Sequence, residues 1–355
     1  MKDVEVAGAL GGASKMAYSY EEIAESSFDL AEMPVEPASP DWEETIEDDL
    51  VKTKTKIKAG QMTAGEWSDI KNWDFFSELI EKDDWNGLPD YWGFDISQPQ
   101  TVQVSNSIGV PIPNAEVQLV DVEGTVIYSA LSDNKGSAVL FPAMFGQGAG
   151  HSIKVIHGNE EKIIRVSNGD EMQSIPVEIE IDPVAADVID IAFTVDATGS
   201  MGDEMNYLKT ELKDVVERVK KDNPGVKVRI GLVFYRDEGD AYVVRSFPFT
   251  ESLGEALKNI SDQHAAGGGD YPEAVHSGLA AAIDGLDWSK EARTKMNFLI
   301  LDAPPHYQEG VLSSLQKSCE SASEQGIRLV PVTASGIEKD TEFLMRFMAI
   351  ATGGT

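Results

Sequence analysis

The chain has 355 residues, 42% of them hydrophobic and 25% charged, which is a globular composition with room for about two or three domains. Its 61 acidic residues against 29 basic ones give a formal net charge of -32, which repels phosphate backbones and anionic lipid headgroups and excludes nucleic acid as an expected partner. The single cysteine, Cys319, excludes an intramolecular disulfide, and no apolar run approaches the ~20 residues that span a bilayer.

The N-terminal residues 1–60 are expected to be a disordered acidic tether. Between Glu21 and Asp49 there are twelve acidic residues, three prolines and no Lys or Arg. A segment of this composition cannot bury enough apolar surface to offset the entropy that it would lose on ordering.

Residues 61–98 are expected to be a short helical docking segment. Thr63 and Glu66 have the spacing of a capping box, and apolar residues then recur at helical spacing, which predicts a helix over residues 63–81. We expect the aromatic rings of this segment to dock it onto a neighbouring domain. These rings belong to Trp67, Trp73, Phe76, Trp85, Tyr91 and Trp92.

Residues 99–182 alternate short apolar-patterned runs with turn residues. About seven strands at this spacing predict a small antiparallel β-sandwich. The series Gly-Val-Pro-Ile-Pro-Asn-Ala-Glu-Val at residues 109–117, followed by Ser-Asp-Asn-Lys-Gly-Ser-Ala at residues 132–138, resembles the carboxypeptidase-regulatory-like, transthyretin-like sandwich. That resemblance implies a spacer or presenting module without chemistry of its own.

Residues 183–355 alternate strand and helix patterns. The buried-strand run over residues 188–195 is followed by an amphipathic segment over residues 203–221. Further helices are expected over residues 252–262, where Ser252 and Glu255 have capping-box spacing, and over residues 272–286, 309–325 and 339–351. This pattern predicts a doubly wound α/β domain, whose largely parallel sheet is covered by helices on both faces. In such sheets ligands bind beyond the carboxyl ends of the strands.

Three loops of this α/β region are expected to converge into one metal site, over residues 196–202, 267–273 and 302–306. Each loop contributes an aspartate where glycine or proline lets the backbone turn sharply, and the first reads Asp-Ala-Thr-Gly-Ser-Met-Gly. Carboxylate and hydroxyl oxygens are hard ligands that suit Mg²⁺, Mn²⁺ or Ca²⁺ and not Zn²⁺ or Cu²⁺. A short glycine-bounded loop that leaves waters on the ion favours Mg²⁺.

From about residue 187 to its end the chain resembles a von Willebrand factor A domain, whose Asp-x-Ser-x-Ser metal-ion-dependent adhesion site is similar to the first loop. The resemblance implies that Thr198 and Ser200 bind the metal directly, while Asp196 and Asp302 act mostly through coordinated waters. Asp270 stands where the family commonly has threonine. The resemblance also implies that a carboxylate of a partner protein completes the coordination. Further residues are expected at the rim, facing a ligand: Gly199, Met201, Tyr271, Arg236 and His306.

These features predict a cation-dependent protein-binding or adhesion module with no catalytic activity. The chain has neither a Gly-x-Ser-x-Gly nucleophile elbow nor a Gly-x-x-x-x-Gly-Lys phosphate loop. A metal-dependent hydrolase stays open as an alternative, and so does an intracellular assembly factor that works with a chaperone-like ATPase. The order of tether, spacer and adhesion domain suits an extracellular, bacterial-surface or periplasmic location, with the cytoplasm as the alternative. Family members usually continue beyond residues 351–355, so we expect the domain to be truncated at this end.

The presence of Asp270 as a third aspartate in the expected site leads to a prediction about ligand binding. With Asp196, Asp270 and Asp302 ionised around one divalent ion, the local charge is about -1, which should hold the cation well but attract a partner carboxylate less strongly. We expect Asp270→Thr to tighten the binding of an acidic peptide ligand. Unchanged binding, measured by titration in Mg²⁺, would contradict this reading.

Overall fold

The computed structural model describes residues 66–355, apart from residues 98, 143, 145–149, 166–172, 182–186, 270 and 334–336. The expected tether over residues 1–60, Thr63 of the expected capping box and the expected metal ligand Asp270 lie outside the described residues. Within the part that is described, no helix is both long enough and apolar enough to cross a bilayer.

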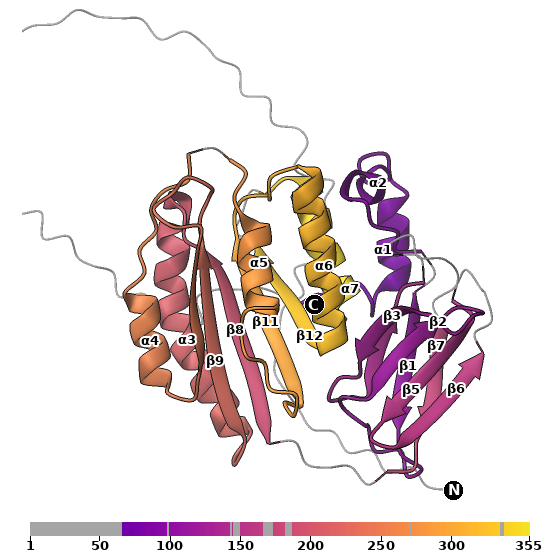
Figure 1. Ribbon diagram of the computed structural model, residues 1–355. Coiled ribbons are helices and arrows are strands. Elements are labelled where there is room, and N and C mark those ends of the chain that lie inside the picture. Colours follow the sequence, from indigo (N-terminus) through magenta and orange to yellow (C-terminus); the bar gives the residue numbers. More distant parts are fainter. Residues whose placement is uncertain are drawn as a thin grey trace, which may run out of the picture. The chain divides into compact units, whose positions relative to one another are not determined.

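The C-terminal part of the chain is a five-stranded α/β sheet (Figure 1). In spatial order its strands are β10 (Val244–Thr250), β9 (Lys227–Tyr235), β8 (Val188–Asp196), β11 (Thr294–Leu301) and β12 (Ile327–Thr333). All neighbours pair in parallel except β10, which is antiparallel to β9. The largely parallel sheet expected from the alternating pattern is therefore present.

Helices cover both faces of this sheet (Figure 1). They are α3 (Gly202–Asp222), α4 (Leu253–Ser261), α5 (Val275–Ile283), α6 (Glu309–Gln325) and α7 (Lys339–Ala351). Side chains of α3 and α4 share one hydrophobic cluster with the sheet, whereas α5, α6 and α7 share another. Burial on two faces explains why β8 is enclosed along nearly its whole length and has a continuous apolar run.

Residues 100–178 form seven strands in two further sheets. One sheet has the order β4 (Ser137–Leu140), β1 (Gln100–Ser105) and β7 (Gln173–Glu178), and the other has the order β3 (Val126–Leu131), β2 (Glu116–Val120), β5 (Ser152–His157) and β6 (Glu160–Arg165). All pairs are antiparallel except β1 and β7, so the expectation of a wholly antiparallel arrangement is wrong at that pair. The resemblance of this region to a carboxypeptidase-regulatory-like sandwich stays a prediction.

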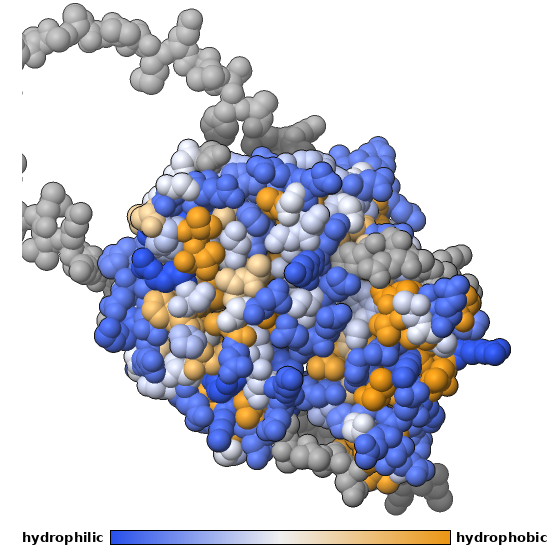
Figure 2. Space-filling view, viewed as in Figure 1, coloured by the Kyte–Doolittle hydropathy of each residue, from blue (hydrophilic) through white to orange (hydrophobic). Residues whose placement is uncertain are grey.

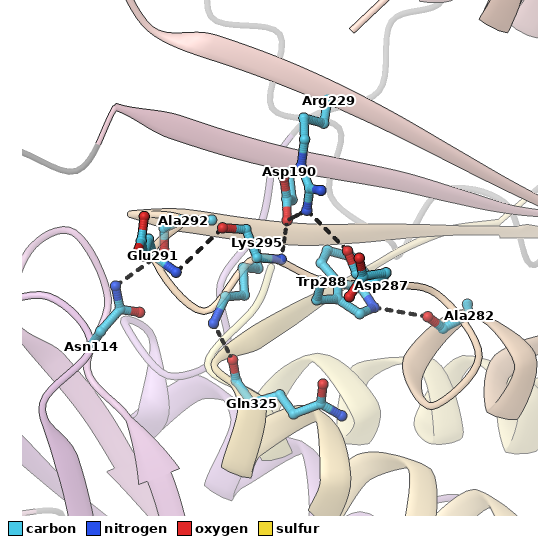
Figure 3. A network of polar contacts seen from close by, with 11 residues as sticks. Asn114, Asp190, Arg229, Ala282, Asp287, Trp288, Glu291, Ala292, Lys295 and Gln325 are labelled. Carbon is cyan, nitrogen blue, oxygen red and sulfur yellow. Dashed lines mark hydrogen bonds and ion pairs between the residues drawn. The ribbon is translucent and has the colours of Figure 1, made fainter. Parts of the chain in front are cut away.

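The strand-rich region and the α/β region are joined by buried contacts. The Tyr128 hydroxyl of β3 is buried and donates to the Ala351 carbonyl at the end of α7 over 2.9 Å. Asn114 donates to the Ala292 carbonyl over 3.1 Å, within the polar network drawn in Figure 3. Side chains from both regions belong to the same hydrophobic cluster as α7.

The segment before the strands contains two short helices, α1 (Trp73–Ile80) and α2 (Leu88–Trp92). The helix expected over residues 63–81 thus begins only at Trp73 within the described residues. Asp69 explains the late start, because its buried carboxylate pairs with Arg346 of α7 at 2.9 Å, and residues 69–72 form turns instead. Aromatic packing attaches the segment to α7: the ring of Phe94 stacks on that of Phe347 with centroids 3.7 Å apart.

The face drawn in Figure 2 carries little continuous apolar area. In Figure 2 apolar residues form small separate spots among hydrophilic ones. The most exposed large apolar side chains of the strand-rich region are those of Ile108, Val122 and Ile163.

A buried ion pair near the start of β8 gives a stability prediction. Asp190 is fully buried, and Arg229 of β9 donates to both of its carboxylate oxygens over 2.7 and 2.6 Å (Figure 3). Because removing the guanidinium leaves a buried charge uncompensated, Arg229→Met should lower the free energy of unfolding by about 3–5 kcal/mol.

Urea denaturation measures this effect. The matched control is Arg218→Met, because Arg218 makes an exposed ion pair with Asp214 on α3. This control should cost less than about 1 kcal/mol. Equal costs for the two substitutions would contradict the assignment of a structural role to the buried pair.

Candidate metal site

The first expected metal loop leaves the carboxyl end of β8 and closes on itself. Oδ1 of the buried Asp196 accepts hydrogen bonds from the backbone N–H and the hydroxyl of Thr198, over 2.8 and 2.7 Å. The Thr198 hydroxyl lies 3.4 Å from that of Ser200. A short 3-10 turn, η2 (Gly199–Met201), then leads directly into α3. The alternating Asp, Thr and Ser side chains therefore bring their oxygens together, as the sequence predicts.

The second loop is held against the first by backbone contacts. The Gly199 N–H donates to the Gly267 carbonyl over 3.1 Å. Gly268 has φ +73°, and a Cβ there would stand 2.8 Å from Glu273 Oε1 and 3.1 Å from Thr198 Cβ. Only glycine allows the backbone to pass so closely between these two side chains.

The third loop joins through Glu273. Its N–H donates to the Pro304 carbonyl over 2.9 Å, and residues 273 and 305 form an isolated parallel bridge. The helix expected over residues 272–286 consequently begins only at Val275, because the backbone before it is extended and paired with the third loop. All three loops line one pocket of about 230 Å³, to which the third contributes Asp302.

The carboxylates at this edge of the sheet are not neutralised by protein groups. Among the described residues, three buried carboxylate oxygens lack a hydrogen-bond partner here: Asp196 Oδ2, Glu273 Oε2 and Asp302 Oδ1. Burial, together with the charges of Asp302 and Asp237, raises the pKa of Asp196 to about 6. Burial likewise raises the pKa of Glu273 to about 8, with added repulsion from neighbouring carboxylates. The site is therefore short of positive charge.

These donors fit a hard divalent cation. Within the described part of the chain, no three His, Cys, Asp or Glu side chains are placed to hold a metal ion by themselves. A cation here would therefore depend on the hydroxyls of Thr198 and Ser200 together with Asp196 and Asp302. Hydroxyls with carboxylates, and partnerless carboxylate oxygens beside them, are the donor set that Mg²⁺ or Ca²⁺ prefers. The expected ligand Asp270 is not among the described residues.

The residues expected at the rim fall into two groups. Gly199 and Tyr271 line the pocket, and the Tyr271 side chain is 47% exposed. Met201 is instead fully buried in the cluster beneath α3 and α4, so the expectation that it faces a ligand is wrong. Its position in η2, one residue after the exposed Ser200, turns its side chain into the core.

The two rim residues that carry positive or titratable groups are already partnered. Arg236 donates to the carbonyls of Ala197 and His264 over 3.0 and 2.7 Å, and thus supports the backbone of the first loop. The His306 imidazole is 2.6 Å from the carboxylate of Asp237. Both side chains are therefore held by other parts of the protein, and neither lines the pocket as the sequence predicts.

Two acidic residues that the sequence reasoning missed belong to this site. Glu273 lies in the predicted helix but faces the pocket instead. Asp240 accepts hydrogen bonds from the N–H groups of Gly268 and Asp237, over 2.9 and 3.2 Å, and so fixes the glycine-rich loop. A signal for Glu273 was present, because a carboxylate followed a proline at the end of a glycine-rich loop.

Comparison with protein families identifies this region. Residues 190–353, which hold all three loops, match the von Willebrand factor type A domain. A VWA domain is therefore present in this chain, which is consistent with a protein-interaction or adhesion module.

Related proteins share parts of this domain. The chain is 35% identical over 124 residues to an ariadne-like RING finger protein of Acanthamoeba polyphaga mimivirus, covering 34% of this chain and 12% of that protein. It is 29% identical over 146 residues to an alpha-protein kinase of Dictyostelium discoideum, and this match covers 41% of this chain and 23% of the kinase. It is 33% identical over 106 residues to von Willebrand factor A domain-containing protein 7 of Homo sapiens, and this match covers 30% of this chain and 11% of that protein. The chain spans less than a quarter of the length of these relatives.

Solved structures give a distant likeness. The pilus adhesin SpaC from Lactobacillus rhamnosus GG is matched with a TM-score of 0.36 and 13% identity over 46% of this chain and 27% of that one. Its open conformation is matched with a TM-score of 0.35 and 16% identity. A likeness of this size does not inform the function.

The raised pKa of Glu273 predicts a pH dependence of stability. Because this pKa is about 8 in the folded protein against an ordinary 4.5, the folded state binds the proton more tightly than the unfolded state does. The resulting stabilisation is complete below pH about 4.5 and is lost as the pH rises to about 8. In EDTA, Glu273→Gln should therefore weaken the fall in melting temperature between pH about 5 and about 8.

The control for this experiment is Glu160→Gln, at an exposed position on β6. It should leave the pH profile of the wild-type protein unchanged. A Glu273→Gln profile with the slope of the wild type would show that this carboxyl does not titrate in the expected range.

Proposed function

We propose that the VWA domain binds a divalent cation, with Mg²⁺ preferred, at the candidate metal site and binds a protein ligand through that cation. The observation that carries the proposal is the set of three buried carboxylate oxygens without a partner, beside two hydroxyls in one open pocket. A cation would relieve the repulsion among these carboxylates, which protein donors leave uncompensated.

The residues around the pocket would have different roles in binding the cation. Thr198 and Ser200 would offer their hydroxyl oxygens, and Asp196 orients Thr198 by accepting both its N–H and its hydroxyl. Asp302 would supply negative charge from the third loop. When bound, the cation supplies a positive charge that attracts a carboxylate of the ligand, which would enter through the open side of the pocket.

The lining of the pocket consists mainly of carboxylates, hydroxyls and glycine backbone. Its described residues include no histidine, cysteine or lysine. His306 follows the third loop but is engaged by Asp237. No feature of the described pocket favours a hydrolase over a binding module.

Thermal denaturation in Mg²⁺ and in EDTA tests the cation site. At a Mg²⁺ concentration about 100 times the dissociation constant, binding should raise the free energy of unfolding by about 2.7 kcal/mol, which corresponds to a rise in melting temperature of about 5–10 °C. Asp196→Asn and Ser200→Ala should each abolish most of this rise.

The matched control is Asp95→Asn, an exposed aspartate outside the pocket, which should keep the full rise. If Mg²⁺, Mn²⁺ and Ca²⁺ all fail to stabilise the wild-type protein, the proposed cation dependence is wrong. A rise that persists unchanged in both site variants would place the ion elsewhere.

A further inference from the structure

An exposed aromatic surface adjoins the metal site. It is formed by the side chains of Tyr271, Tyr307 and Tyr91, which are 47%, 51% and 38% exposed. Tyr271 belongs to the second metal loop, and Tyr307 follows the third. Tyr91 comes from α2, at the end of the α/β region where the third loop lies (Figure 1). We call these three residues the tyrosine surface.

The tyrosine surface is preformed by contacts between α2 and the third loop. The rings of Tyr91 and Tyr307 stack with centroids 4.1 Å apart and an interplanar angle of 14°. The Tyr307 hydroxyl donates to the Tyr91 carbonyl over 2.8 Å. Beneath them, the buried indole of Trp92 donates to the Asp340 carbonyl over 2.9 Å. Aromatic faces that are already fixed lose little entropy when a ligand packs on them.

The same surface is negatively charged. Glu338 and Asp340, at the start of α7, both act on the hydroxyls of Tyr91 and Tyr271, whose pKa values are raised first by burial and then by these charges. Lys339, which lies between the two acids in the sequence, is paired with Asp84 of the docking segment. The carboxylates are therefore not cancelled by their nearest basic neighbour.

Aromatic faces beside carboxylates are suited to one kind of group. A lysine ammonium or an arginine guanidinium is attracted by the face of a tyrosine ring and by a nearby negative charge at the same time. An acidic or phosphorylated group would instead be repelled by Glu338 and Asp340. Charge complementarity thus selects a basic side chain as the occupant.

We propose that the tyrosine surface, together with Glu338 and Asp340, binds a lysine or arginine side chain of the same protein ligand whose carboxylate reaches the cation. The inference rests on the proposed function and extends it. The ligand segment would carry an acidic and a basic residue close together in space, one for the metal and one for the tyrosine surface. The binding face would accordingly include α2, which lies outside the VWA match of residues 190–353.

A displayed library of random peptides that share one fixed aspartate tests the inference. The full chain is used for selection in Mg²⁺, and bound peptides are released with EDTA. We expect the released peptides to be enriched in arginine or lysine near the aspartate. Replacing that basic residue with alanine in a selected peptide should weaken its binding about two- to thirty-fold.

Variants of the protein then locate the basic subsite. Tyr307→Ala, or the pair Glu338→Gln and Asp340→Asn, should remove the enrichment of basic residues and keep the requirement for aspartate and Mg²⁺. The amide at position 340 can still accept the Thr341 N–H bond that the aspartate accepts, so the start of α7 should be preserved. The matched control is the pair Glu123→Gln and Glu160→Gln, two exposed glutamates of the strand-rich region, which should keep the enrichment.

The outcomes separate the two proposals. The inference is overturned if the peptides need Mg²⁺ and aspartate but show no preference for a basic residue. It is also overturned if that preference is the same for the tyrosine-surface variants as for the wild-type protein. Either result leaves the proposed function standing. If EDTA releases no peptides and the bound ones are recovered only by a later acid wash, the proposed function is overturned, and with it the two-point ligand. The Mg²⁺-induced rise in melting temperature, measured for each variant, shows that its metal site and fold are intact.

Discussion

The constraint on which the VWA domain depends is the burial of several carboxylates at one edge of its sheet. Asp196, Glu273 and Asp302 each present an oxygen without a protein partner. The backbone donors of the loops are used to hold the loops to one another, as the Gly199 N–H does with Gly267. The fold therefore gathers negative charge and leaves it uncompensated, which is costly unless a cation is supplied from solution.

Strand β8 shows that the uncompensated charge is a local property and not a general one. Near its start, Asp190 is fully buried and accepts hydrogen bonds from two of the three guanidinium nitrogens of Arg229 (Figure 3). The Ser289 N–H donates to the same carboxylate. At its end, Asp196 is equally buried, and its carboxylate accepts hydrogen bonds from the N–H and the hydroxyl of Thr198 alone among the described residues. Two aspartates on one strand thus serve different purposes: the first holds neighbouring segments together, and the second is left able to accept a ligand.

Regular elements of the VWA domain follow from the sequence because their causes are local. Helix α6 spans Glu309–Gln325 and helix α7 spans Lys339–Ala351, as the apolar periodicity predicts. Ser252 caps α4 by accepting the Glu255 N–H, as the spacing of these residues predicts. Where a distant partner competes, the local signal fails: Arg346 holds Asp69 from far along the chain, and the helix expected at residue 63 begins ten residues later.

The sequence by itself determined the first loop of the candidate site, since Asp196, Thr198 and Ser200 at alternate positions after a buried strand specify a hard-oxygen loop. Only the tertiary structure decided what surrounds that loop. Glu273 lines the pocket because its N–H donates to the Pro304 carbonyl, which holds this residue against the third loop. The Arg236 guanidinium instead donates to backbone carbonyls. These outcomes depend on which loops meet at the sheet edge. Side-chain periodicity records which face of an element is buried, and it carries no information about which distant segment will lie against it.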